Sequence, residues 1–269
     1  MEVTMSEGAL KLVSSQTPLL KVSGLEKRFG SVSACCDVSF ELYPGEVLGV
    51  VGESGSGKTT LLRCISGNIK PTSGTVAFDL KGEGPIDIFE LGEPDRRRLQ
   101  REEWGFVHQN PRDGLRMRVS AGANVAEPLM NLGNRHYGNM RQLTVDWLER
   151  VELDTQRIND NPRVFSGGMQ QRIQIARNLI HGPRLVFMDE PTGGLDVSVQ
   201  ARLLDLLREL VRRLGLSAII VTHDLAVARL LADRLIVMKD GRIVETGLTD
   251  QVLDDPQHAY TQLLVSAVL

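Results

Sequence analysis

The chain has 269 residues, 42% of them hydrophobic, and carries 31 Lys and Arg against 34 Asp and Glu, for a net charge of -3. This length supports one large core, or one core with a smaller appended lobe. The balanced charge excludes the strong positive field of proteins that bind nucleic acid through its phosphates, so we expect no nucleic-acid partner.

The cysteines and the hydropathy pattern bear on location. Cys35, Cys36 and Cys64 have neither a disulfide-framework pattern nor a metal-binding spacing, and they favour a reducing cytoplasm. No apolar run approaches the roughly 18 to 20 residues that span a bilayer, and the chain begins without the pattern of a signal peptide. We expect a soluble, cytoplasmic protein that would reach a membrane only indirectly, through another chain.

The first third of the sequence predicts short strands around a glycine loop. Residues 1–18 are polar and lack periodicity, which predicts a flexible extension. Strands are expected over 19–29 and 38–51, broken at Pro44, with a helix over 59–67 after the loop. The segment PTSGTVAF predicts a turn and a further strand.

The middle of the sequence predicts helices. A charged helix is expected behind Pro94, and nearby acids balance its arginines, which favours a solvated face over a phosphate-binding patch. The helix-forming segments between Val119 and Arg163 predict an inserted helical lobe. Its second helix carries apolar residues at helical spacing, namely Leu143, Trp147, Leu148 and Val151. We expect Trp147 and Trp104 to be packing residues.

The last third alternates helices with nearly continuous apolar runs. The runs are LVFM before Asp189, AIIVT and LIVM, and the amphipathic helix QARLLDLLRELVRRLG lies between the first two. Such alternation is typical of parallel strands covered by helices. The predicted fold class is therefore α/β.

The stretch GESGSGKT, Gly52 to Thr59, matches the phosphate-binding pattern G-x-x-x-x-G-K-S/T between a buried strand and a helix. Gly55 and Gly57 allow backbone N–H groups to point at phosphate oxygens, Lys58 would reach the β and γ phosphates, and the Thr59 hydroxyl would bind magnesium. The predicted nucleotide contacts here are Gly52, Ser54, Gly55, Ser56, Gly57, Lys58, Thr59 and Thr60.

Two acids follow the buried run LVFM. Asp189 is expected to hold hydrated magnesium, and Glu190 to activate the attacking water as general base. A second anion site is expected at FSGGMQQR, where Ser166 stands at a helix N-cap position and Gly167 and Gly168 clear the approach. Because the first loop already holds one side of the γ phosphate, the second site is expected to close over nucleotide bound by another chain.

Taken together, these motifs resemble those of the ATP-binding cassette (ABC) ATPases, from about Leu19 to the end. The resemblance implies a P-loop domain with a RecA-like core (about 19–110 and 165–250), an antiparallel β subdomain, a helical subdomain (about 111–164) and a helical tail (about 251–269). It also implies ATP and Mg²⁺ as ligands.

The same resemblance assigns further residues. Gln109 would contact magnesium, and His223 would contact the γ phosphate as a switch histidine. Phe29 would stack on adenine, and Gln170 and Asp196, in the signature and the dimer-contacting loop, would contribute to nucleotide binding. The catalytic set is thus Glu190, His223 and Gln109, and the metal set is Thr59, Gln109 and Asp189. The other histidines are expected to be structural.

The resemblance also implies a second ABC subunit, either another copy or a related chain. Phrases such as VTHDLAVARLLADR and DDPQHAYTQLL resemble dipeptide, oligopeptide and nickel importer ATPases. The combination of EWGFVHQNPRDGLRMRVSAG, NRHYGNMR and FSGGMQQRIQIARNL resembles the ATP-binding subunits of bacterial carbon-phosphorus lyase systems. That resemblance implies a soluble enzyme core of subunits G, H, I and J as partner and a role in phosphonate catabolism.

The residues themselves leave three functions open. They are a lyase-associated ATPase, an importer ATPase that acts with a permease, and a nucleotide-gated scaffold with little turnover. Charge, spacing and periodicity do not separate the first two. The resemblance to the lyase-associated subunits implies that residues 107–125 form part of the docking face for the enzyme core.

Overall fold

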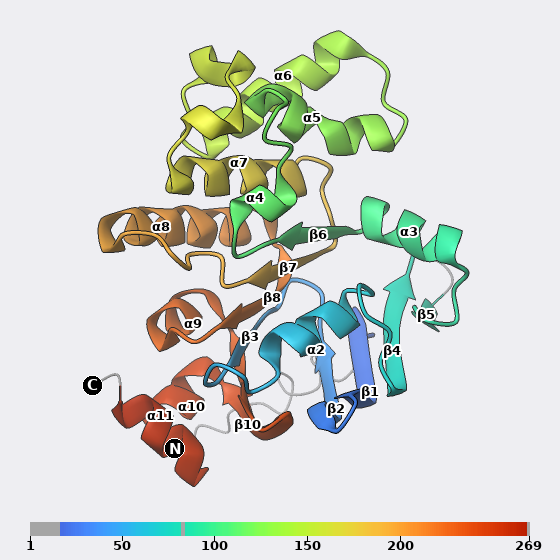
Figure 1. The fold of residues 1–269 in the computed structure, drawn as a ribbon, viewed down its shortest axis with the longest axis vertical. Helices are drawn as coiled ribbons and strands as arrows, with labels where there is room; N and C mark the ends of the chain where they lie inside the picture. The colour runs from blue at the N-terminus through green and yellow to red at the C-terminus, as the bar shows by residue number, and fades with distance from the viewer. Residues whose placement is uncertain (1–16, 82–83, 268–269) are drawn as a thin grey trace, which may run out of the picture.

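The computed structural model describes residues 17–81 and 84–267, so most of the predicted extension over 1–18 lies outside the described residues. Two sheets form the framework (Figure 1). The antiparallel sheet has the order β2 (Val32–Leu42), β1 (Leu20–Phe29), β4 (Ser73–Leu80), β5 (Gly84–Asp87). The central sheet has the order β10 (Arg242–Leu248), β9 (Arg234–Lys239), β3 (Val47–Val51), β8 (Ser217–Thr222), β7 (Leu185–Asp189), β6 (Trp104–Val107).

The helices fall into three groups. Those beside the sheets are α2 (Lys58–Ile65), α3 (Glu93–Glu102), α8 (Val197–Leu214) and α9 (Leu225–Leu231). Those of the inserted region and the helix beneath it are α4 (Pro111–Gly114), α5 (Ala121–Asn131), α6 (Tyr137–Arg150), η1 (Thr155–Asn159), η2 (Pro162–Val164) and α7 (Gly167–Leu179). The chain closes with α10 (Thr249–Asp254) and α11 (Ala259–Ser266). Figure 1 shows α5, α6 and α7 together at one end of the molecule and α10 and α11 at the other.

The central sheet is parallel except at its β9–β10 edge. Every residue of β3, β7 and β8 is buried, which explains their unbroken apolar runs. Alternate side chains of β7 point to opposite faces of the sheet. Val186 and Met188 pack in the cluster that includes α5 to α8, whereas Leu185 and Phe187 pack toward the antiparallel sheet and α2. The loop between β3 and α2 therefore starts from the middle of a sheet that is packed on both sides.

The predicted parallel sheet and the helices over 119–163 are present. Trp104, Trp147, Cys35 and Cys64 are buried, as expected for packing residues, whereas Leu143 is exposed despite its helical spacing. Strands β1 and β2 are 10 and 11 residues long rather than short, and their pairing is interrupted by register shifts. Strands β5, β6 and β10 lie in segments for which no strand was predicted. Among the described residues, no helix is both long and apolar enough to cross a bilayer.

Candidate nucleotide-binding site

The loop between β3 and α2 has a backbone that requires glycine. Gly52, Gly55 and Gly57 have φ values of 150°, 85° and 103°, in the region that residues with a Cβ rarely adopt. A Cβ on Gly52 would collide with the carbonyl oxygen of Met238, and one on Gly57 with that of Ala34. Neighbouring strands therefore press on the loop from outside and hold its curl.

Lys58 begins α2 and lies beneath this loop with 6% of its surface exposed. Its Nζ donates to the carbonyl oxygens of Gly52, at 2.8 Å, and Glu53, at 2.7 Å. Burial lowers the pKa of Lys58, and the carboxylates of Glu190, Asp189 and Glu53 act in the opposite direction. The structure thus holds a desolvated cation beneath the curled loop and within the field of three acids.

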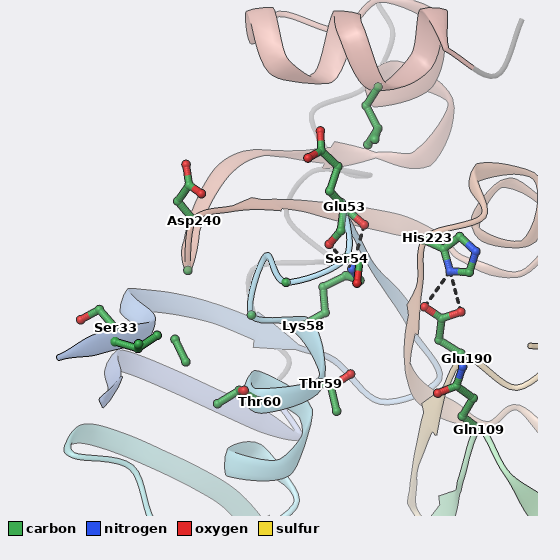
Figure 2. Close-up of a pocket in the computed structure, with 17 residues that line it drawn as sticks. Ser33, Glu53, Ser54, Lys58, Thr59, Thr60, Gln109, Glu190, His223 and Asp240 are labelled. Atoms are coloured by element: carbon green, nitrogen blue, oxygen red, sulfur yellow. Dashed lines mark hydrogen bonds and ion pairs between the residues drawn. The ribbon is translucent and has the colours of Figure 1, made fainter. Parts of the chain in front are cut away.

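Two acids lie at the end of β7 (Figure 2). Asp189 closes the strand and is largely buried, and its Oδ1 accepts a hydrogen bond from Oγ1 of Thr59 at 3.2 Å. Burial raises the pKa of Asp189, and the hydrogen bond from Thr59 opposes the shift. Glu190 follows, and both of its carboxylate oxygens lie near Nδ1 of His223, at 2.7 and 2.6 Å. The parallel pairing of β7 with β8 brings these acids beside the histidine that follows β8.

The backbone of Glu190 is unusual. Its φ is 46°, a left-handed conformation that is uncommon for a residue with a Cβ and often marks a functional site. Its N–H donates to the carbonyl oxygen of Val221 at 2.8 Å, and its own carbonyl accepts from the N–H of Gly193 at 2.9 Å. These two hydrogen bonds hold the backbone of Glu190 in this conformation, in which its carboxylate contacts His223.

A cavity of about 870 Å³ joins the loop to these groups. Ten of the predicted site residues line it, namely Gly52, Ser54, Gly55, Gly57, Lys58, Thr59, Thr60, Gln109, Glu190 and His223. Figure 2 shows Lys58 and Thr59 on the loop side, with Gln109 below Glu190 and His223. A glycine-rich loop, a buried lysine and a hydroxyl next to a carboxylate form a site suited to a triphosphate with a hard divalent cation.

Other predicted residues lie outside this lining. The Ser56 side chain is buried beneath the loop, near Nζ of Lys58 at 3.5 Å, and Asp189 lies behind Thr59. Phe29 is 49% exposed at the end of β1, and its ring contacts the Lys27 amine, 4.9 Å from the ring centre. Residues 32–34, which follow Phe29, do line the cavity. The structure thus brings the start of β2, which pairs with the end of β1, to the cavity.

The signature segment lies apart from the cavity. Ser166 is the N-cap of α7, and its Oγ accepts from the N–H of Met169 at 3.3 Å. Gly168 packs so closely on Val199 that a Cβ would collide with it. Ser166, Gly167 and Gly168 do not line the cavity. In Figure 1, β6 and α4 lie between α7 and α2, the helix that follows the phosphate-binding loop. A single copy of the chain therefore does not bring its own signature to its own phosphate-binding loop.

Gln170 and Asp196 also have places of their own. Gln170 is buried, and its amide donates to the carbonyl oxygens of Pro162 and Phe165, both at 2.9 Å. This side chain braces the turn before Ser166 and, in this conformation, has no amide proton left for a ligand. Asp196 is the exposed N-cap of α8 and makes no side-chain cap hydrogen bond.

The remaining histidines make local contacts outside the cavity lining. His136 and His258 accept backbone N–H groups at the starts of α6 and α11. The His181 ring lies 3.2 Å from the Trp104 carbonyl oxygen, and burial lowers its pKa. The His108 ring packs on Phe106, and burial also lowers its pKa.

Seven further residues line the cavity, namely Val32, Ser33, Ala34, Glu53, Asp240, Gly241 and Leu264. Glu53 stands inside the glycine motif and could have been predicted as part of the site. The others come from β2, the β9–β10 turn and α11, whose approach to the loop no local pattern indicates.

Comparison with known proteins agrees with this geometry. Residues 35–193 match the family model described as ABC transporter. The chain is 62% identical over 252 residues to the "Putative phosphonates utilization ATP-binding protein PhnK" of Escherichia coli K12, covering 94% of this chain and 98% of that protein. It is 41% identical over 239 residues to the "Oligopeptide transport ATP-binding protein OppF" of the same organism, covering 88% of this chain and 70% of the other.

Two solved structures are similar along most of the chain. The dimeric ATP-binding cassette MJ0796 in a post-hydrolysis state with ADP and Pi superposes with a TM-score of 0.76 at 31% identity, covering 86% of this chain and 98% of that one. CbiO1 of Clostridium perfringens, part of an ABC transporter complex, superposes with a TM-score of 0.78 at 29% identity, covering 89% and 92%. Both the family and the fold expected from the motifs are confirmed. The chain belongs to the ABC family of ATP-binding proteins, whose members bind ATP with Mg²⁺ and hydrolyse it.

Proposed function

We propose that this chain is the ATPase subunit of a cytoplasmic carbon-phosphorus lyase assembly that degrades phosphonates. The observation that carries the proposal is the 62% identity, along 94% of the chain, to the phosphonates utilization protein PhnK. Peptide import proteins from Brucella and OppF reach only 41%. In this proposal the enzyme core of subunits G, H, I and J receives the conformational change that ATP turnover drives.

The cavity supplies the grip on ATP. The backbone N–H groups of the loop and the start of α2 would hold the phosphates, and Lys58 would exchange its carbonyl partners for phosphate oxygens. Phe29, at the exposed end of β1, would stack on adenine.

The residues present fit Mg²⁺, because Thr59 and Asp189 already place a hydroxyl and a carboxylate oxygen 3.2 Å apart. Thr59, Asp189 and Gln109 would hold the ion. When bound, Mg²⁺ neutralises charge on the β and γ phosphates.

Glu190 is the proposed general base. It lines the cavity on the side opposite the loop, where it can take a proton from a water molecule. His223 would donate to the γ phosphate through Nε2, the ring nitrogen that Glu190 does not contact, and the hydrogen bond between Nδ1 and Glu190 would keep the carboxylate in place. Gln109 lies on the same side and would report the occupancy of the site to the segment that follows it.

A second chain completes the site in this proposal. Ser166 is exposed at the start of α7 and lies outside the cavity of its own chain, so its side chain is accessible to another protomer. The dimeric state of the MJ0796 cassette supports such pairing. Two chains would clamp two ATP molecules head to tail, with Ser166, Gly167, Gly168 and Asp196 of one facing the phosphate loop of the other. Hydrolysis would open the clamp.

An importer ATPase is the second candidate, because OppF and several putative peptide import ATPases are about 40% identical to this chain. The two candidates differ in their partners. Purification of the tagged chain from its native host, with identification of the co-purified proteins, separates them. Soluble phosphonate-degrading enzymes support the lyase assembly, whereas integral membrane permeases overturn it.

Growth provides an independent measurement. A strain that lacks this gene is expected to fail on a phosphonate as sole phosphorus source while growing normally on inorganic phosphate. The wild-type gene should restore growth, and the Glu190→Gln variant should not. Restoration by the variant would show that turnover at this site is not needed.

A further inference from the structure

The C-terminal helix α11 contributes to the wall of the nucleotide cavity. Leu264 lines the cavity, and its neighbour Leu263 is 70% exposed, so α11 presents one side to the site and the other to solvent. Figure 2 shows α11 above the cavity, with Glu53 of the phosphate-binding loop extending toward it.

One hydrogen bond joins this helix to the loop backbone. The N–H of Glu53 donates to Oη of Tyr260 at 3.0 Å, across 207 residues of sequence. Tyr260 is 7% exposed and packs in one apolar cluster with Val51, the last residue of β3 before the loop. Burial raises the pKa of Tyr260, the hydrogen bond from the N–H of Glu53 acts in the opposite direction, and the nearby carboxylate of Glu53 adds to the rise.

The position of Tyr260 is itself held from two sides. The amine of Lys239 lies 4.9 Å from the centre of its ring. The carboxylate of Glu245, on β10, accepts the N–H groups of Gln257 at 2.8 Å and His258 at 3.0 Å, just before α11 begins. These contacts hold the start of α11 against β10, the edge strand of the central sheet, and thereby restrict the position of the Tyr260 hydroxyl beside the loop.

The bond matters for the loop because of where Glu53 stands. Glu53 follows Gly52 directly, and its carbonyl oxygen is one of the two that Lys58 contacts. On the far side of the loop, the Ser56 carbonyl accepts the N–H of Gly241 at 3.0 Å. The curled backbone is therefore tied at Glu53 by α11 and at Ser56 by the β9–β10 turn.

We infer that Tyr260 is a positioning residue for ATP binding: α11 forms one wall of the nucleotide cavity, and the Tyr260 hydroxyl holds the Glu53 end of the phosphate-binding loop in its phosphate-ready curl. Tyr260 acts through Glu53 and does not itself contact the phosphates. The inference deepens the proposed nucleotide site and depends on it.

The test uses the full-length chain and the Tyr260→Phe variant, which removes one hydroxyl and keeps the packed ring. We expect the Kd for MgATP and the KM for ATP to rise roughly two- to tenfold, the range that loss of one hydrogen bond allows. We expect kcat to change by less than twofold, because the substitution leaves Glu190, His223 and the contact between them unchanged.

Tyr43→Phe is the matched control. Its hydroxyl donates to Glu41 at 2.8 Å on the antiparallel sheet and does not line the cavity, so its loss should leave both constants unchanged. A second pair tests the wall itself: Leu264→Ala should raise the Kd for MgATP, and Leu263→Ala should not.

The outcomes separate the inference from the function it depends on. Wild-type protein that neither binds nor hydrolyses MgATP removes the nucleotide site altogether. If the wild-type protein binds and hydrolyses MgATP and the Tyr260→Phe variant has the same Kd and KM, the proposed role of Tyr260 is overturned while the nucleotide site stands. A Tyr260→Phe variant whose kcat falls while its KM stays constant overturns it as well, because loop positioning acts on binding.

Discussion

Nδ1 of His223 lies 2.7 Å from Oε1 and 2.6 Å from Oε2 of Glu190, so the histidine after β8 contacts the acid after β7 without any other group between them. The side chain of Glu190 is 16% exposed, and that of His223 is 66% exposed. The imidazole therefore faces solvent with one side while it restrains the carboxylate with the other. This pairing makes the two residues one functional unit and sets the first two predictions.

Glu190→Gln should abolish steady-state turnover, with a fall of about 100-fold or more, because the amide cannot accept a proton from water. ATP binding should persist, since the loop and Lys58 are unchanged, and the closed dimer should accumulate. Phosphate release and light scattering with MgATP measure the two effects. Glu209→Gln, on the outer face of α8, is the control and should behave as wild type. Undiminished turnover in Glu190→Gln would remove this acid from the role of base.

His223→Asn should lower kcat about tenfold or more and raise the KM for ATP less, because the carboxylate of Glu190 loses the group that restrains it. Steady-state ATPase kinetics measure both constants. His136→Asn is a matched control, since His136 caps α6 through a backbone N–H and Asn caps helices equally well. If the two variants showed equal activities, the His223–Glu190 contact would have no part in turnover.

Ser166→Arg should leave MgATP binding to the monomer intact and prevent dimerisation on ATP, because Ser166 lies outside the cavity of its own chain. Size-exclusion chromatography with light scattering, in the Glu190→Gln background, reports the dimer. Ser120→Arg is the control, since Ser120 caps α5 at the same 3.3 Å distance, and it should lose a similar amount of stability without loss of the dimer. A weakened affinity in the Ser166→Arg monomer would show that the signature acts within one chain.

Glu127 supports a prediction on stability. Its carboxylate is 11% exposed and contacts Arg116, at 2.5 Å, and Arg177 of α7. Glu127→Gln should lower the free energy of unfolding by about 3 kcal/mol, because it leaves the half-buried Arg177 without its counter-charge. Thermal or urea unfolding measures the change. Glu93→Gln removes an exposed pair with Arg97 and should cost about 0.5 kcal/mol or less. Equal losses in the two variants would show that the Glu127 cluster is no stronger than a surface pair.

Local chemistry made much of the site predictable. A glycine-rich loop between an apolar strand and a helix predicts a phosphate-binding loop. Acids that directly follow an apolar strand are predicted to lie at the carboxyl end of that strand. Gly52, Lys58, Thr59 and Glu190 were predicted in this way, whereas His223 was assigned by the resemblance to ABC ATPases, and the structure brings all five to one cavity. The buried β3, β7 and β8 were predictable for the same reason, since parallel strands covered on both faces have unbroken apolar runs.

Sequence by itself therefore determined the family, the phosphate-binding loop and the identity of the acids, because each depends on neighbours along the chain. The tertiary structure decided which distant groups meet that loop: Ala34 and Met238 press on its glycines, Tyr260 binds its backbone, and Ser166 stays away from it. These relationships depend on strand order and on the path of α11 across the sheet edge. Such long-range packing depends on how the apolar faces of sheets and helices are buried against one another, which a short stretch of sequence does not specify.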